Sequence, residues 1–222
     1  MKKAVVLLSG GLDSATTLYY ALNKGYEVRA LIFEYGQRHR KEVAAARAVA
    51  KAAKVSFEVV HIGLPWKGSA LLDRGMKVPS GGVKKGGIPT TYVPARNIIF
   101  VSFAASFAEA IGARTIFIGA NAVDYSGYPD CRPAFFKAFQ VALDQGLKAG
   151  VEKHGISIET PLIDLSKEEI VCLGQDLGVP FGKTWSCYAG SQVPCGVCDS
   201  CRLRAQGFAA AGIPDAALKG AR

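Results

Sequence analysis

The amino-acid sequence predicts one α/β domain with an open parallel sheet. Apolar, β-favouring runs alternate with helical segments from the first residues onward, and three such β–α steps follow one another in order. Steps of this kind place successive strands parallel and join them by right-handed crossovers. A chain of 222 residues, half of them hydrophobic, is long enough to bury a full core in one domain with a small appendage.

The individual elements are placed by their residue patterns. Apolar or alternating runs predict strands at residues 4–8, 27–33, 55–62, 114–120 and 156–159. Helices are predicted at residues 15–23, 38–53, 94–111, 133–153, 166–178 and 202–210. Ser166 followed by Glu169 forms a capping box at the start of the fifth helix. Cys172, inside that helix, is expected to lie in the core.

Composition indicates the general class of protein but does not identify its ligand. The formal net charge of +9 suits nucleic acid, ATP or an anionic small substrate equally well. No apolar run approaches the roughly 18 residues that span a membrane, and Met1 leads into a strand without a cleavage site, so we expect a cytoplasmic protein. Six cysteines without a secretion signal favour thiols and metal over disulfides.

A short glycine-containing turn follows the first predicted strand. This turn, residues 9–14, reads Ser-Gly-Gly-Leu-Asp-Ser, and we call it the first loop. Strand, tight turn and helix together aim backbone N–H groups and a helix N-terminus at one point, which binds an anion. The loop has neither the Walker A lysine nor dinucleotide-binding glycine spacing. A plain connecting turn would explain the glycines but not the two hydroxyls and the carboxylate. The first loop resembles the PP-loop of N-type ATP pyrophosphatases, which transfer AMP to a substrate oxygen.

The segment from residue 63 to residue 94 is rich in glycine and proline, with Lys84 and Lys85 at its centre. Long loops within a compact domain are often lids over an active site. We expect this segment to be mobile and to become ordered when nucleotide and substrate bind. The alternative is a disordered surface excursion.

Polar residues gather in two further places. Arg96 and Asn97 lie in the first turn of the helix 94–111, where they face a ligand or serve only as a solvated arginine and a capping asparagine. The loop after the fourth strand carries acids, tyrosines and an arginine, which suit a flat heterocycle bearing a carboxylate. The residues concerned are Asp124, Tyr125, Asp130 and Arg132. A polar surface turn is the alternative.

Lys167 occupies the first turn of the helix 166–178, where the helix dipole disfavours a positive charge. A phosphate partner would explain a lysine at this position. An exposed surface lysine is the alternative.

Four cysteines near the C-terminus have metal-ligand spacing. Cys195, Cys198 and Cys201 follow one another at intervals of two intervening residues, and Cys187 precedes them. Two intervening residues let a turn aim both thiolates at one ion, so four thiolates predict a closed structural zinc site. An iron–sulfur cluster is the competitor, but the ferredoxin run would place a further cysteine and a proline soon after the third cysteine.

Four segments in this order resemble those of the 7-cyano-7-deazaguanine synthase family. They are the first loop, residues 92–97, residues 124–132 and the four cysteines, and the resemblance extends over essentially the whole chain. It implies a Rossmann-like PP-loop architecture, with residues 1–180 as the ATP-binding and substrate domain and residues 181–222 as a zinc-binding subdomain. It also implies a homodimer without a direct nucleic-acid partner.

The implied reaction joins ammonia to 7-carboxy-7-deazaguanine in queuosine biosynthesis. ATP would convert the carboxylate to an adenylate, ammonia would give the amide, and a second activation would give the nitrile. The chain would be a C–N bond-forming ligase that uses ATP with magnesium. No glutaminase segment is recognisable and residue 2 is lysine, so we expect free ammonium or ammonia from a partner.

Site roles follow for three groups of residues. Ser9, Asp13, Ser14 and Lys167 are the expected catalytic residues, with Asp13 helping to place Mg²⁺. The expected nucleotide-binding residues are Leu8, Ser9, Gly10, Gly11, Leu12, Asp13, Ser14, Ala15, Thr16, Thr17 and Leu18. The expected substrate-binding residues are Arg96, Asn97, Asp124, Tyr125, Asp130 and Arg132. A tRNA-thiolating PP-loop enzyme and a zinc-ribbon nucleic-acid-binding module are the alternatives.

Overall fold

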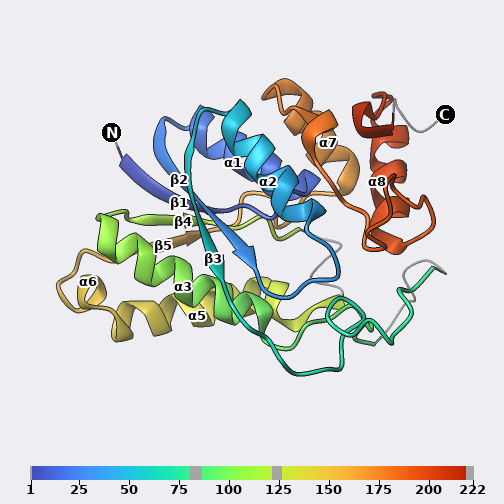
Figure 1. Cartoon of the computed structure of the whole chain (residues 1–222). Helices are drawn as coiled ribbons and strands as arrows, with labels where there is room; N and C mark the ends of the chain where they lie inside the picture. The colour runs from blue at the N-terminus through green and yellow to red at the C-terminus, as the bar shows by residue number, and fades with distance from the viewer. Residues whose placement is uncertain (1, 81–86, 122–126, 219–222) are drawn as a thin grey trace.

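The described residues form one parallel sheet covered by helices on both faces (Figure 1). The structure is a computed structural model that describes residues 2–80, 87–121 and 127–218. The strands are β1 (Lys2–Leu7), β2 (Tyr26–Glu34), β3 (Ser56–His61), β4 (Thr115–Phe117) and β5 (Ser157–Glu159). All neighbouring pairs are parallel, in the order β3-β2-β1-β4-β5. The predicted parallel α/β fold is confirmed.

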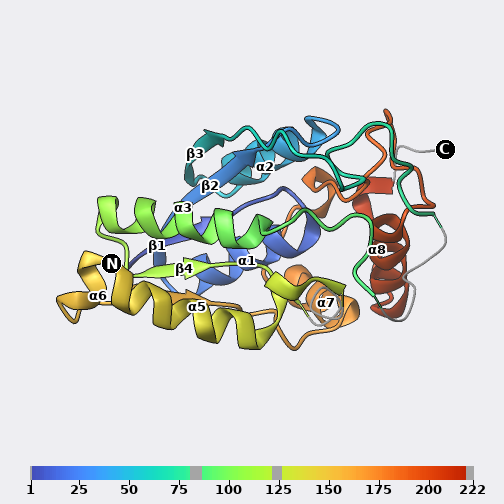
Figure 2. The same cartoon turned by 90° about the horizontal axis from the view of Figure 1, so that it is seen from below.

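Two helical layers enclose the sheet. Helices α1 (Leu12–Asn23), α2 (Lys41–Ala52) and α7 (Lys167–Asp176) cover one face, above the sheet in Figure 1. Helices α3 (Arg96–Ile111) and α5 (Pro133–Gly146) cover the other face and lie nearest the viewer in Figure 2. Each face has its own core of buried apolar side chains. None of the described helices is both long and apolar enough to cross a membrane.

The strand order reverses between β1 and β4. The chain runs outward from β1 to β3 and then returns to the other side of β1 to form β4 and β5. In an open α/β sheet this reversal leaves a crevice beyond the carboxyl ends of the two strands, where ligands bind. The first loop follows β1, so the topology positions it at this crevice.

Several element boundaries differ from those predicted. The helix expected to reach residue 153 ends at Gly146, because Leu147 is extended and a separate short helix, α6 (Lys148–Val151), follows. Glu109 of α3 accepts the backbone N–H of Ala149 at 2.8 Å, so a distant side chain holds the start of α6. Cys172 is exposed, not in the core, because α7 turns Ile170 and Val171 toward the sheet.

The segment between β3 and α3 is described at residues 63–80 and 87–94, which contain turns but neither helix nor strand. Two hydrogen bonds from the Arg38 side chain, to the carbonyls of Arg74 and Met76, hold it on the domain. Lys84 and Lys85 lie outside the described residues, so the expected closure of this segment stays a prediction.

The C-terminal segment packs on α7 through α8 (Asp199–Ala210), which lies at the edge of the molecule in Figure 1. Short 3₁₀ helices occur at Pro129–Cys131, Phe181–Lys183 and Ala216–Leu218. The buried guanidinium of Arg204 in α8 donates to both carboxylate oxygens of Asp215, at 2.6 and 2.8 Å, and to the Thr184 hydroxyl. Arg204 therefore connects helix α8 with the chain around Thr184 and with the chain around Asp215.

Replacing Arg204 with alanine is expected to lower the free energy of unfolding by about 3–5 kcal/mol, because the Asp215 carboxylate would stay buried without its partner. Arg40→Ala is the matched control, since Arg40 forms a 2.9 Å ion pair with Glu34 on the surface and such pairs contribute at most about 1 kcal/mol. Denaturant unfolding followed by circular dichroism measures both changes. Equal effects of the two substitutions would contradict this interpretation.

Candidate active site

The first loop is clamped against helix α2. Gly10 has a φ of +85°, which favours glycine, and a Cβ atom built there would lie 2.4 Å from the carbonyl oxygen of Glu42 and 2.5 Å from the nitrogen of Ala46. A side chain at this position would push the loop away from α2. The close approach explains why Gly10 is required.

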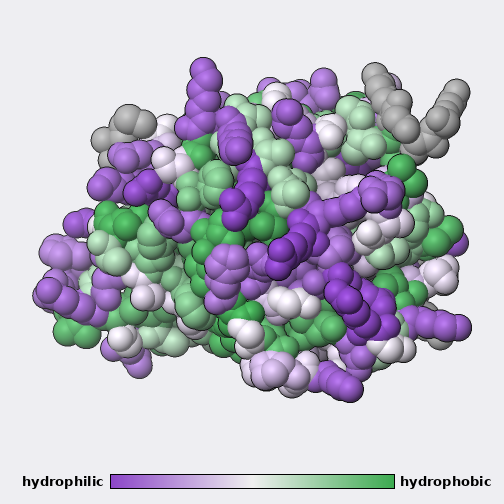
Figure 3. Space-filling view, viewed as in Figure 1, coloured by the Kyte–Doolittle hydropathy of each residue, from purple (hydrophilic) through white to green (hydrophobic). Residues whose placement is uncertain are grey.

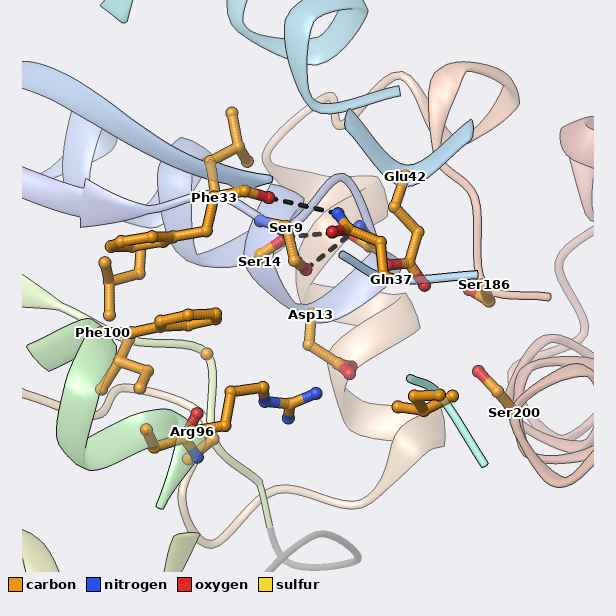
Figure 4. Close-up of a pocket in the computed structure, with 18 of the residues that line it drawn as sticks. Ser9, Asp13, Ser14, Phe33, Gln37, Glu42, Arg96, Phe100, Ser186 and Ser200 are labelled. Carbon is orange, nitrogen blue, oxygen red and sulfur yellow. Dashed lines mark hydrogen bonds between the residues drawn. The ribbon is translucent and has the colours of Figure 1, made fainter. Parts of the chain in front are cut away.

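Hydroxyl groups hold the loop in shape. The Ser14 hydroxyl accepts the backbone N–H of Ser9 at 3.2 Å, lies 3.0 Å from the Ser9 hydroxyl and donates to the Gly11 carbonyl at 3.2 Å. Figure 4 shows Ser9 and Ser14 side by side above Asp13. These two serines therefore organise the loop before any ligand is bound.

A cavity of about 220 Å³ opens beside the first loop, at the carboxyl ends of β1, β2 and β4. The predicted nucleotide-binding residues that line it are Leu8, Ser9, Gly11, Leu12, Asp13 and Ser14. The others do not line it; they are Gly10, Ala15, Thr16, Thr17 and Leu18. Ala15 to Leu18 are completely buried in the core, where the two threonine hydroxyls donate to backbone carbonyls of α1.

Lys167 forms an ion pair with Asp13 at 2.7 Å. This carboxylate explains a lysine in the first turn of α7, where the helix dipole opposes it. The second carboxylate oxygen of Asp13, Oδ1, is buried and has no hydrogen-bond partner among the described residues. A buried carboxylate oxygen without a partner is suited to a hard cation such as Mg²⁺.

The start of α3 brings Arg96 and Asn97 to the cavity wall. The Asp130 carboxylate accepts the backbone N–H of Asn97 at 2.9 Å, and the Asn97 side chain donates to the Asp130 carbonyl and to the Cys131 sulfur, each at 3.1 Å. Asp130 therefore caps α3, and the fixed first turn directs Arg96 into the cavity. Burial raises the pKa of Tyr35, and the positive charge of Arg96 opposes this shift.

Two other predicted substrate residues, Asp130 and Arg132, are not at this wall. Asp130 is only 5% exposed and does not line the cavity. Arg132 is exposed, also outside the lining residues. Asp124 and Tyr125 lie outside the described residues.

Several cavity residues escaped the sequence analysis. Tyr35 and Gln37 lie in the turn that follows β2, and Glu42 lies in the first turn of α2. The rule that ligands bind at the carboxyl ends of strands could have identified the turn after β2, because β2 is parallel to β1. Stacked rings of Phe33 and Phe100, with centroids 4.0 Å apart, form an apolar part of the wall.

Residues from the C-terminal segment complete the cavity. Trp185, Ser186, Tyr188 and Ser200 line it, although they are distant from the first loop in sequence. No local pattern in the sequence signals their position, because the packing of α8 on α7 brings them there.

Glu42 is a second acid in the cavity. Burial raises its pKa to about 7, the Cys187 sulfur acts in the same direction, and the positive charge of Arg96 opposes the shift. Removal from water therefore favours the neutral form of this carboxyl group.

The four cysteines converge as predicted. The sulfur atoms of Cys187, Cys195, Cys198 and Cys201 all lie within 4.8 Å of one another. Backbone N–H groups of Ala189 and Cys195 donate to the Cys187 sulfur at 3.4 and 3.3 Å, a contact that favours a thiolate. Cys198 caps α8 and Cys201 lies in its first turn, so the helix begins earlier than expected. This cluster can hold one metal ion.

Trp185 connects the cysteine cluster to the first loop. Its backbone N–H donates to the Gly10 carbonyl at 2.9 Å, and its indole N–H donates to the Cys187 carbonyl at 2.8 Å. The Lys41 ammonium lies 4.7 Å from the centre of the Trp185 ring and donates to the carbonyls of Ser191 and Gln192. Disorder at the cysteine cluster would therefore reach the first loop.

Replacing Cys195 with serine is expected to abolish stoichiometric metal binding and to raise the Kd for ATP about tenfold or more, since four thiolates hold the metal far better than three. Cys172→Ser is the control, because Cys172 is exposed and outside the cluster. Metal analysis and calorimetric titration with ATP give the two readouts. Loss of metal with unchanged ATP affinity would refute the connection through Trp185.

Comparison with known proteins supports the resemblance over nearly the full chain. The 7-cyano-7-deazaguanine synthase of Dechloromonas aromatica is 56% identical over 222 residues, covering 98% of each chain. That of Methylococcus capsulatus is 55% identical over 219 residues, covering 97% of each.

A solved structure, the predicted subunit of a tRNA methyltransferase from Methanocaldococcus jannaschii, is similar in fold alone. Its TM-score is 0.50 at 16% identity, with 79% of this chain and 75% of that chain covered. The family described as "Queuosine biosynthesis protein QueC" matches residues 3–212, a range that includes the first loop and all four cysteines. By this match and by the identity to its curated relatives, the chain belongs to the QueC family.

Proposed function

We propose that this chain catalyses the ATP-dependent conversion of 7-carboxy-7-deazaguanine and ammonia to 7-cyano-7-deazaguanine, as a ligase that forms a C–N bond. Its relatives carry the name of this synthase. The observation that carries the proposal is one cavity lined by both the first loop and Arg96. Such a cavity can hold ATP phosphates beside a substrate carboxylate.

The chemistry explains why ATP is needed. A carboxylate cannot lose oxide, because oxide is too poor a leaving group. Transfer of AMP to the carboxylate oxygen creates a good leaving group, and ammonia then displaces AMP to form the amide. A second AMP transfer, to the amide oxygen, and loss of protons from nitrogen yield the nitrile. Neither step requires a covalent enzyme nucleophile, so positioning and charge neutralisation carry the catalysis.

The first loop and α7 supply the phosphate site in this proposal. Backbone N–H groups of the loop and the N-terminus of α1 bind the phosphates, while Lys167 neutralises charge on the departing pyrophosphate. Asp13 would hold Mg²⁺ through Oδ1, its buried oxygen without a partner. Magnesium, when bound, supplies further positive charge to the phosphates.

The substrate carboxylate faces Arg96, which can donate two parallel hydrogen bonds to it. Asp130 and Asn97 keep Arg96 in place through the first turn of α3. We keep Asp124, Tyr125 and Arg132 as candidates for the heterocycle. The segment of residues 63–94 remains our candidate lid.

We also propose a structural zinc ion in the four-cysteine cluster, within a subdomain of residues 181–222. Four thiolates leave no open coordination position, so the ion would stabilise the fold and take no part in the reaction.

We also propose that the chain assembles as a homodimer. Figure 3 shows hydrophobic residues among the hydrophilic ones on the face that α3 crosses, and Ile98 and Phe103 of this helix are 40% and 43% exposed. Sedimentation as a single chain would refute the dimer.

The direct test incubates the purified, metal-loaded protein with ATP, Mg²⁺, ammonium and 7-carboxy-7-deazaguanine. Mass spectrometry is expected to detect the nitrile and AMP, with the amide formed transiently, because each activation releases one AMP. Omitting ammonium should stop nitrile formation. Absence of both amide and nitrile would refute the proposed function.

Replacing Arg96 with methionine is expected to lower kcat/KM for the carboxylate substrate by about 100-fold, in line with the loss of a charged hydrogen-bonding partner. The amide intermediate, supplied as the starting substrate, should lose much less because it carries no negative charge. Arg114→Met is the control, since Arg114 is exposed at the opposite end of the sheet. An equal loss with carboxylate and amide would show that Arg96 does not act on the carboxylate.

A further inference from the structure

Glu42 lines the cavity beside the first loop. It is the second residue of α2. Its carbonyl oxygen lies close to the position that a Cβ atom on Gly10 would occupy, so the backbone of Glu42 packs directly against the first loop. Figure 4 shows its side chain pointing into the cavity, beside Ser186 and across from Arg96. In the proposed function AMP transfer takes place in the cavity beside the first loop, and Glu42 lines this same cavity.

The Glu42 carboxylate has no hydrogen bond or ion pair with any residue that the structure describes. Two neighbouring acids have partners, because Asp13 pairs with Lys167 through one of its two oxygens and Asp130, outside the cavity lining, caps α3. Among the described residues of this cavity, Glu42 is therefore an acid with both carboxylate oxygens available to a ligand, whereas Asp13 has one.

Few charged or titratable groups face Glu42 from the elements packed against it. They are Arg96 of α3, Tyr35 after β2 and the Cys187 sulfur from the C-terminal segment. Burial raises the pKa of this carboxyl to about 7, while Arg96 lowers it. A carboxylate that is poised near neutrality and partly removed from water suits proton exchange with a small cation.

We propose that Glu42 binds the ammonium ion and removes one of its protons, so that ammonia is produced beside the activated carboxylate. This inference rests on the proposed function. Ammonium has no lone pair and cannot attack a carbonyl carbon until a proton leaves. Transfer of that proton to a carboxylate converts two opposite charges into two neutral groups, and a water-poor cavity favours the neutral pair.

Atoms and charges balance in this step. Ammonium gives one proton to the Glu42 carboxylate, which becomes a carboxylic acid, and the remaining electron pair on nitrogen forms the new C–N bond. The C–O bond to AMP breaks, and AMP leaves with its electron pair. Nitrogen loses its extra proton to water as the amide forms. Glu42 returns its own proton to water before the next cycle.

The experiment compares two nitrogen nucleophiles in Glu42→Gln. Hydroxylamine is largely unprotonated at neutral pH and needs no base before it attacks, whereas ammonium does. The substitution is expected to lower kcat/KM for ammonium by about 100-fold or more and to change hydroxamate formation from hydroxylamine less than threefold. Raising the pH should narrow the ammonium defect, because free ammonia becomes more abundant in solution. Glu42→Asp, which keeps a carboxylate, should restore part of the ammonium activity.

Controls separate this role from a structural one. Glu152→Gln removes an exposed carboxylate far from the cavity and should match wild type with both nucleophiles. Metal content, melting temperature and ATP–pyrophosphate exchange without a nitrogen source should be unchanged in Glu42→Gln.

Each other outcome has a definite meaning. An equal loss with ammonium and hydroxylamine would overturn the inference, and a raised KM for the heterocyclic substrate would then assign Glu42 to substrate recognition. If Glu42→Gln reacts with ammonium at the wild-type rate, the inference is overturned as well. If the wild-type chain forms neither amide nor hydroxamate, the proposed function itself fails, and this inference fails with it.

Discussion

The contact between Gly10 and helix α2 is the constraint on which the rest of the site depends. Because Gly10 has no side chain, the first loop lies directly on the first turn of α2, and its carbonyl accepts the backbone N–H of Trp185. The loop is thus held between the sheet domain and the C-terminal segment. These contacts fix the shape of the loop without a ligand, so in the proposed function its N–H groups would already be oriented toward developing charge.

Carboxylates near the cavity have three different tasks that their sequence context does not distinguish. Asp130 accepts a backbone N–H at the start of α3, and Asp13 pairs with Lys167 through one of its two carboxylate oxygens. Glu42 makes no ion pair or hydrogen bond within the described part of the chain. The task of each carboxylate depends on its bonding partner in the folded chain and on how deeply it is buried. Removal from water raises the pKa of Glu42, whereas the ammonium group of Lys167 keeps one oxygen of Asp13 engaged.

The C-terminal segment contributes to the cavity as well as to stability. The cysteine cluster supports Trp185, and Ser186 and Ser200, each next to a cysteine of the cluster in sequence, line the cavity. Arg204 holds the same segment together through buried bonds to Asp215 and Thr184. A metal ion bound by the four cysteines would not contact the reacting groups. It would affect the cavity indirectly, by fixing the residues that pack against it.

Patterns in the sequence were enough to predict the parallel sheet, the strand–turn–helix of the first loop and the convergence of four cysteines. Each is signalled by residue types and spacings within short stretches of the chain. The tertiary structure decided which polar residues meet. Asp13 and Lys167 are 154 positions apart, and Asn97 and Asp130 are 33 apart, so their pairing follows from the return of the chain from β3 to β4 and from the packing of α7. A sequence specifies such contacts only through the whole fold, because side chains from distant elements meet only after the sheet and its helices have packed.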